Sequence, residues 1–137
     1  MSYFDKINGK QVIKEDLLDG KAEEIANSFL KQPLTEKRRE RPLTSAQLRR
    51  FYADFKQLEK KVNLETRDFL ETKPFIKMMK SKASYAANPD NQKIPTVFKN
   101  FLVNHVDQIH SKDDFKAFML HFEAVVGFFY GLEGRSI

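Results

Sequence analysis

Apolar residues recur every three or four positions through most of this chain, and that spacing constrains its fold more than any other feature. The stretch 44–62 shows the pattern most clearly. Its apolar residues fall within about a third of the circumference of a helix: Leu48, Phe51, Tyr52, Phe55, Leu58 and Val62. Thr44 followed by Gln47 fits a capping box at the start of this helix. Because glycine and proline number only five each, few hairpins are available, and we expect an all-α fold.

Four more segments follow the helical period: 16–31, 66–87, 95–109 and 111–131. Leu18 opens the apolar stripe of the first segment. Pro74 is compatible with the second only if it kinks the helix or starts a new one. We expect Gly131 to end the last helix. No segment sustains the two-residue alternation of a strand over a useful length, so the sequence predicts a compact bundle of about five helices.

Length and composition indicate one folded unit. At 137 residues, with thirteen phenylalanines, the chain is long and apolar enough to bury a core. We expect a single helical domain over residues 1–137. Within it, residues 1–14 form an N-terminal arm without a clear period, and residues 32–43 form a charged linker.

Several functional classes are excluded or disfavoured. The chain has no cysteine, which rules out disulfides and zinc–thiolate sites and favours a cytoplasmic protein. No apolar stretch has the length of a signal peptide or a membrane span. His105 lies on an apolar helix face and His110 beside a helix terminus, while His121 and Glu123 match the H-x-E of zinc deaminases without the required cysteines. We therefore expect no catalysis, no metal and no cofactor.

The net charge of +5 is unevenly distributed along the chain. Residues 36–61 and 73–99 are two basic blocks, each with a net charge of +5, and mildly acidic stretches flank and separate them. Two such blocks that join on one face of a compact fold would suit phosphate binding.

Within the first block, Arg49, Lys56 and Lys60 fall within about 40° on a helical wheel and lie next to the apolar stripe. Cations at this pitch can follow successive phosphates. A solvated helix face is the alternative. The run KRRER at 37–41 is either a charged linker or a phosphate-binding arm formed by Arg38, Arg39 and Arg41.

The second block includes four lysines without an intervening acid: Lys73, Lys77, Lys80 and Lys82. Helical spacing places Lys77 and Lys80 on an outward side, opposite Phe75 and Met79. Lys82 points toward the apolar side, which is unusual unless it meets a partner at the edge. Tyr85, next to the NPDN turn, either stacks on a base or packs within the fold, and packing is the more common role.

Three stretches resemble the small subunit of type III-A CRISPR effector complexes, the Csm small subunit. The first resembles its opening helix and reads LTSAQLRRFYADFKQLEKKV. The second, KSKASYAANPDN, is similar to its K-x-A-Y-A-A-G-R signature. The third comprises FKNFLVNHVDQI and FKAFMLHFEAVVGFFYG, which resemble its last two helices. The likeness runs from Leu43 to Gly131, in the family's order and spacing.

The chain departs from the family pattern at two places. Asn88 and Pro89 stand where the family has Gly-Arg, so one expected cation is absent, and Ala46 replaces the usual serine before Gln47. Residues 1–42 have no clear counterpart.

The resemblance implies a non-catalytic subunit that repeats along the guide-RNA filament and lines the groove for the target RNA. Guide–target pairing would read sequence, while the protein grips backbone. Expected partners are guide RNA, target RNA, other subunits of the complex and further copies of the chain, as a dimer or filament. Arg49 is the first candidate contact by family position. The full expected RNA-binding set is Arg49, Arg50, Lys56, Lys60, Lys77, Lys80, Lys82 and Tyr85.

Two other functional classes remain open. A helical adaptor could bind protein through its phenylalanine-rich faces, with incidental basic charge. A helix-turn-helix DNA-binding protein could use the helix at 44–62 for recognition. About twenty further helical residues follow that helix, however, instead of a short turn in a compact three-helix unit.

Overall fold

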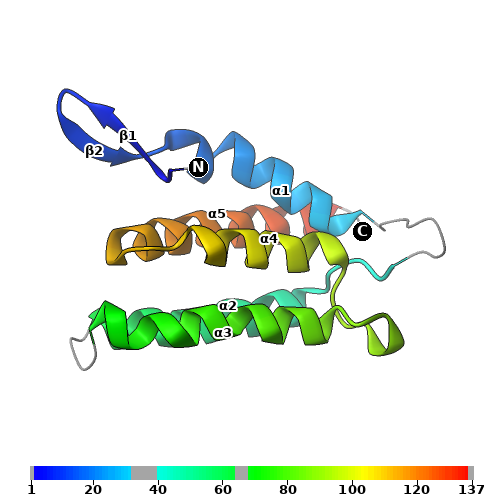
Figure 1. Cartoon of the computed structure of the whole chain (residues 1–137). Helices are drawn as coiled ribbons and strands as arrows, with labels where there is room; N and C mark the ends of the chain where they lie inside the picture. The colour runs from blue at the N-terminus through cyan, green and yellow to red at the C-terminus, as the bar shows by residue number, and fades with distance from the viewer. Residues whose placement is uncertain (1, 32–39, 64–67, 136–137) are drawn as a thin grey trace.

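Five α-helices in three layers form the fold of the described part of the chain (Figure 1). The computed structural model describes residues 2–31, 40–63 and 68–135. Its α-helices are α1 (Gly20–Leu30), α2 (Ser45–Asn63), α3 (Phe69–Ala86), α4 (Thr96–Gln108) and α5 (Lys112–Arg135). Helices α2 and α3 form one layer, α4 and α5 form the middle layer, and α1 lies across the other side of the middle layer. The predicted all-α bundle is confirmed.

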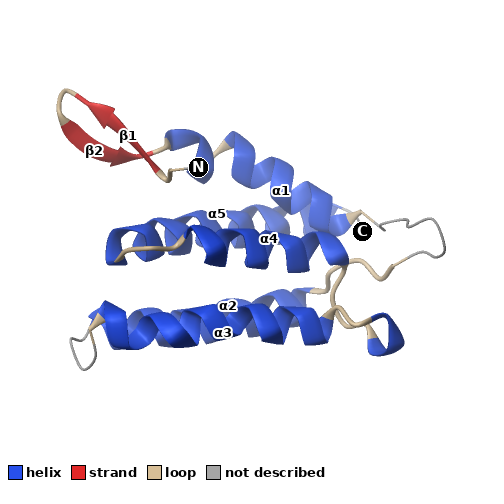
Figure 2. Cartoon of the chain, viewed as in Figure 1, coloured by secondary structure: helices blue, strands red, loops and turns tan. Residues whose placement is uncertain are grey.

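A small β-hairpin precedes the bundle, where we expected an arm without regular structure (Figure 2). Strand β1 (Phe4–Ile7) pairs antiparallel with β2 (Lys10–Ile13). The turn residues Asn8 and Gly9 have φ angles of 53° and 77°, and a type I′ turn requires positive φ at both positions. Each strand has only four residues, too few for alternation to show, but the Asn-Gly pair was itself a hairpin signal.

A 3₁₀ turn (Glu15–Leu18) connects the hairpin to α1 and changes which leucine is buried. The sequence stripe placed Leu18 on the apolar face, but Leu17 is buried and Leu18 is exposed. The prediction was wrong by one residue because a 3₁₀ turn rotates successive side chains by a different angle from an α-helix.

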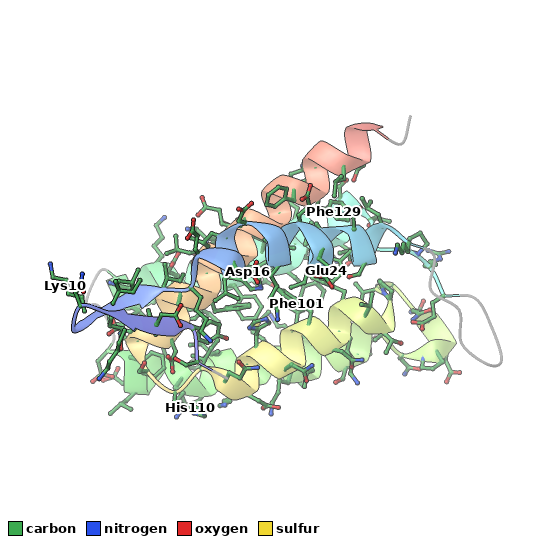
Figure 3. All side chains as sticks on the ribbon, turned by 90° about the horizontal axis from the view of Figure 1, so that it is seen from above. Lys10, Asp16, Glu24, Phe101, His110 and Phe129 are labelled. Atoms are coloured by element: carbon green, nitrogen blue, oxygen red, sulfur yellow. The ribbon has the colours of Figure 1, made fainter. Side chains whose placement is uncertain are left out.

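Phenylalanines from four helices form the centre of the core. Phe29 of α1 makes edge-to-face contacts with Phe98 and Phe101 of α4, at centroid distances of 5.2 and 5.4 Å. Phe55 of α2 meets Phe118 of α5 at 5.2 Å. Figure 3 shows from above how α1 covers the side chains around Phe101. Pairs with this geometry add about 0.5–1.5 kcal/mol each beyond apolar burial, so they fix the three layers relative to one another.

Side-chain caps set the starts of three helices. The Thr44 hydroxyl accepts a hydrogen bond from the Gln47 backbone N–H, as the predicted cap requires. Asp68 caps α3 in the same way through the Glu71 N–H. Ser111 caps α5 through the Asp114 N–H. Such caps satisfy N–H groups that the first helical turn leaves without partners.

Helix α5 continues past the expected stop at Gly131 and ends at Arg135. Neither Gly127 nor Gly131 has a positive φ, and both lie on the exposed side of the helix. A glycine ends a helix when its backbone turns left-handed, and here it stays helical. The prediction for Gly131 was therefore wrong.

The segment Lys112–Glu133 of α5 meets the length and composition of a membrane span. In the structure it is a core helix of the bundle, and it buries Phe115, Phe122 and Phe129 completely against its neighbours. Core helices commonly share this composition, so the segment is weak support for a membrane location.

Candidate nucleic-acid interface

The residues of the predicted stripe on α2, Arg49, Lys56 and Lys60, are exposed. Lys56 lies beside Tyr52, whose ring contacts Phe122 of α5. The Lys56 Nζ donates a hydrogen bond of 2.8 Å to Glu59 Oε1 and lies 6.0 Å from the centroid of the Tyr52 ring. That hydrogen bond raises the pKa of Lys56. Arg49 and Lys60, in contrast, are in no ion pair with other described residues.

Lys77 and Lys80 face α4, so the expectation that they point outward was wrong. Lys77 Nζ donates to the backbone carbonyl of Val106 at 3.1 Å, and Lys80 Nζ donates to Asp107 Oδ1 at 2.6 Å. The bond from Lys80 lowers the pKa of Asp107. Both lysines meet the last turn of α4, where carbonyls lack helical partners and favour positive charge. These two cations therefore join α3 to α4.

The face opposite α4 also differs from the expectation for α3. Phe75 was placed on the core side but is 42% exposed, and Ile76 is buried in its stead. Met79 is buried as expected, so the difference on this face is confined to Phe75. Lys82 and Tyr85 lie toward α2, where they meet residues of the first basic block.

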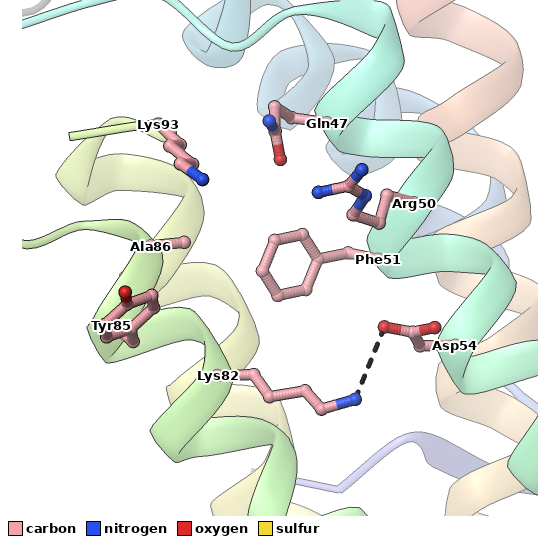
Figure 4. Close-up of a pocket in the computed structure, with 8 residues that line it drawn as sticks. All are labelled: Gln47, Arg50, Phe51, Asp54, Lys82, Tyr85, Ala86 and Lys93. Atoms are coloured by element: carbon pink, nitrogen blue, oxygen red, sulfur yellow. Dashed lines mark ion pairs between the residues drawn. The ribbon is translucent and has the colours of Figure 1, made fainter. Parts of the chain in front are cut away.

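A pocket between α2 and α3 brings three of the predicted residues together: Arg50, Lys82 and Tyr85 (Figure 4). Its remaining lining is Gln47, Phe51, Asp54, Ala86 and Lys93. Figure 4 shows the Phe51 ring pointing from α2 toward Ala86, with Arg50 and Lys93 on one side of it and the Lys82–Asp54 ion pair on the other. Three cations and one carboxylate give the lining a net positive charge.

Packing and backbone hydrogen bonds determine the shape of this pocket. Phe51 is almost fully buried and makes an edge-to-face contact with Phe98 of α4 at 5.6 Å. The N–H groups of Lys93 and Ile94 both donate to the Ala86 carbonyl, at 2.7 and 3.2 Å. A 3₁₀ turn (Pro89–Asn91) returns the chain so that these bonds form. The NPDN turn therefore holds Lys93 against the end of α3.

Tyr85 is 73% exposed, although internal packing was the more common expectation for it. Lys82 meets Asp54 of α2 at 3.6 Å, which is the edge contact that its position required. Lys93 and Gln47 were missed as members of the site. Lys93 lies in the second basic block, but the spacing of residues along the sequence does not predict that it lies near α2.

Only the end of the charged linker is described, and it is docked on the fold. Arg38 and Arg39 lie outside the described residues, and Arg41 is exposed. Glu40 is 4% exposed, and its Oε1 accepts hydrogen bonds of 2.7 Å from the Thr96 N–H, the Thr96 hydroxyl and the Gln92 amide. The Glu40 carboxylate thus caps the start of α4, where negative charge is favourable.

Two of the histidines are buried, in agreement with the core interpretation of His105. The Tyr3 hydroxyl is hydrogen-bonded to His105 Nδ1 at 2.8 Å, and the His105 and His121 rings are 5.1 Å apart. Burial, followed by the neighbouring His121, lowers the pKa of His105 to about 3. Burial also lowers the pKa of His121, whose Nδ1 is hydrogen-bonded to the Leu17 carbonyl oxygen. Within the described ranges, no three His, Asp or Glu side chains are grouped so that they could hold a metal ion.

Comparison with known proteins identifies the family. The family model described as Csm2 Type III-A matches residues 13–133, nearly the whole chain. The chain belongs to the Csm2 family. No curated protein and no solved structure shows significant similarity to it.

Membership confirms the resemblance found in the sequence and extends it toward the N-terminus. This Csm2-family chain is a small subunit of the type III-A effector complex, and other subunits of that complex are its partners. The match begins at residue 13, so it includes α1 and the linker, which had no recognised counterpart in the motifs. Members of this family are structural small subunits of the type III-A complex.

Proposed function

We propose that this subunit binds RNA without catalysis or base-sequence specificity. It would stack along the guide-RNA filament in the cytoplasm and hold the backbone of guide and target RNA. One observation carries the proposal: the fold brings Arg50, Lys82 and Lys93, from separate parts of the sequence, around one pocket with the exposed ring of Tyr85. Cations provide affinity for phosphate that does not depend on sequence.

Exposure and ion pairing support an order of preference among the expected RNA contacts. Arg49, Arg50 and Lys60 are exposed and in no ion pair with other described residues, so phosphate can reach them without displacing an acid. Lys56, Lys80 and Lys82 each lie beside a carboxylate. Phosphate would have to compete with that carboxylate, and we therefore place Arg49 and Arg50 first and Lys80 last among the predicted set.

Filter binding to single-stranded RNAs of several sequences across a salt series tests this proposal. We expect similar affinity for each sequence and a steep salt dependence. Arg50→Ala should reduce the slope of log K against log salt by about 0.7, the value for one phosphate contact on a single strand. Lys10→Ala is the matched control, because it removes one exposed positive charge from the hairpin and should leave the slope unchanged.

A salt-independent affinity, or strong preference for one duplex DNA sequence, would contradict the proposal. The second outcome would favour the helix-turn-helix alternative. Equal slopes for Arg50→Ala, Lys10→Ala and the wild type would place the RNA elsewhere on the molecule.

A protein-contact role is supported by a separate observation on α3. Leu70, Phe75 and Met78 are 74%, 42% and 51% exposed, and Phe75 and Met78 line one hollow beside α2. Large exposed apolar side chains are typical of protein-binding surfaces. We propose that a second copy of the chain packs here in a dimer or filament. Sedimentation velocity should show concentration-dependent association that Leu70→Ser and Met78→Ser together abolish. Unchanged association of the double variant would exclude this surface.

A further inference from the structure

The pocket between α2 and α3 has a shape that binding to phosphates alone does not require. Its volume is about 260 Å³, just below the range of about 300–1,000 Å³ for pockets that enclose drug-sized ligands. This volume suits one planar ring system. Phosphates can be held by lysines and arginines on a convex surface, so a concave apolar pocket among the cations suggests that a ring-shaped group enters it.

Two aromatic side chains give the pocket surfaces for such a ring. Phe51 forms the floor, and its edge-to-face contact with Phe98 keeps it from closing the space. Tyr85 stands at the rim, and its exposed ring stacks on no other aromatic side chain in the described part of the chain. Unstacked bases bind to exposed aromatic rings of this kind.

The α2 side of the pocket carries polar groups that match the edge of a base. Lys82 Nζ lies 3.6 Å from Asp54 Oδ2, an ion pair too long for a hydrogen bond, so the carboxylate keeps capacity to accept from an N–H donor. The Gln47 amide offers both a donor and an acceptor. Base edges present both kinds of group. An ionised acidic side chain of a peptide only accepts hydrogen bonds, so it would offer no donor to Asp54.

Cations stand at the mouth from two different elements. Arg50 comes from α2, and Lys93 comes from the loop before α4. Neither is in an ion pair with another described residue. A nucleotide within a strand has a phosphate on each side of its sugar, so two separate cations can hold the backbone while the base is inside.

We propose that this pocket captures one unstacked base of single-stranded RNA. The base lies against Tyr85 over the Phe51 floor, and Arg50 and Lys93 hold the adjoining phosphates. The proposal rests on the RNA-binding function proposed above and adds a base-binding position to it. Asp54 and Gln47 contact the edge of the base.

Fluorescence anisotropy of the full chain with two labelled probes tests the proposal. One is an oligouridine of about 12 nucleotides, within the range of single-strand site sizes. The other is an abasic ribose–phosphate chain of the same length and charge. We expect Tyr85→Ala to weaken oligouridine binding about tenfold with an unchanged salt slope, because it removes stacking and no charge. Tyr85→Phe should remain within about twofold of the wild type, because the ring is retained.

The abasic probe separates a base contact from a backbone contact. We expect the wild type and Tyr85→Ala to bind it equally, since it has no base to stack. Equal binding of both proteins to oligouridine would overturn the pocket proposal while the salt-dependent RNA binding stands. Absence of salt-dependent RNA binding by the wild type would overturn the proposed function, and the base pocket with it. Because Tyr85 is exposed, we expect both variants to melt with the wild type in circular dichroism.

Discussion

The buried Tyr3–His105 pair should make the stability of this protein fall as the solution becomes mildly acidic. Burial lowers the pKa of His105 to about 3, whereas the unfolded chain has the ordinary histidine value of 6.5. Between these two pH values the unfolded chain binds a proton that the folded chain excludes. The free energy of unfolding therefore decreases as pH falls from about 6.5 to about 3, and the contribution levels off below the folded pKa.

The size of this effect follows from the shift. Each pKa unit corresponds to about 1.4 kcal/mol, so one such histidine lowers the free energy of unfolding by about 2 kcal/mol between pH 7.5 and pH 5. His105 is 6% exposed, so solvent screens it little. His121 acts in the same direction, because burial lowers its pKa as well.

Urea unfolding followed by circular dichroism at pH 7.5 and pH 5 measures this change. The test variant is His105→Asn, which keeps a hydrogen-bonding group near Tyr3 and cannot titrate. It should be less stable than the wild type at pH 7.5 because of the smaller side chain, yet lose about 2 kcal/mol less on acidification. The exposed His110→Gln is the control and should behave as the wild type. A His105→Asn variant that loses as much stability as the wild type would refute the reasoning.

Three further changes should alter the free energy of unfolding, measured by urea titration at pH 7.5. Gly127→Ala should raise it by about 0.5–1 kcal/mol, because a Cβ there meets nothing within 4 Å and the exposed helix interior favours alanine; an unchanged or lower value would contradict this account of α5. Gly9→Ala should lower it by roughly 1 kcal/mol, since its φ of 77° strains a residue with a Cβ, and a neutral effect would show that the hairpin contributes nothing. Glu40→Ala should lower it by about 1–2 kcal/mol by removing the acceptor for the Thr96 N–H, the Thr96 hydroxyl and the Gln92 amide. A loss below about 0.5 kcal/mol, typical of a surface change, would show that this cap is dispensable.

Much of the fold could be predicted because helices are local structures. The apolar period located the five α-helices of the described chain, and the hydroxyl of Thr44 was recognised as a cap from a residue three positions away. Two local features, the N-terminal hairpin and the end of α5, were predicted wrongly from the sequence. Asn8-Gly9 signalled the hairpin, and Gly131 remained helical because nothing forced its backbone into a left-handed conformation.

The candidate site was predicted less well than the fold because charge in the sequence does not show what each charge meets. Lys77 and Lys80 belong to a basic block, yet they bond to Val106 and Asp107, 29 and 27 residues further along the chain. Lys93 was passed over, although the Ala86 carbonyl holds it beside the pocket.

The sequence alone therefore determined the class of fold, the helical segments and the family to which the protein belongs. These depend on apolar spacings of three and four residues and on the order of the family motifs, and both can be recognised in the sequence itself. Only the tertiary structure decided which cations are open to a ligand. A lysine is available or engaged according to neighbours that lie on other helices. The packing of α3 beside α2 is what brings Lys82 and Tyr85 to the same pocket as Arg50.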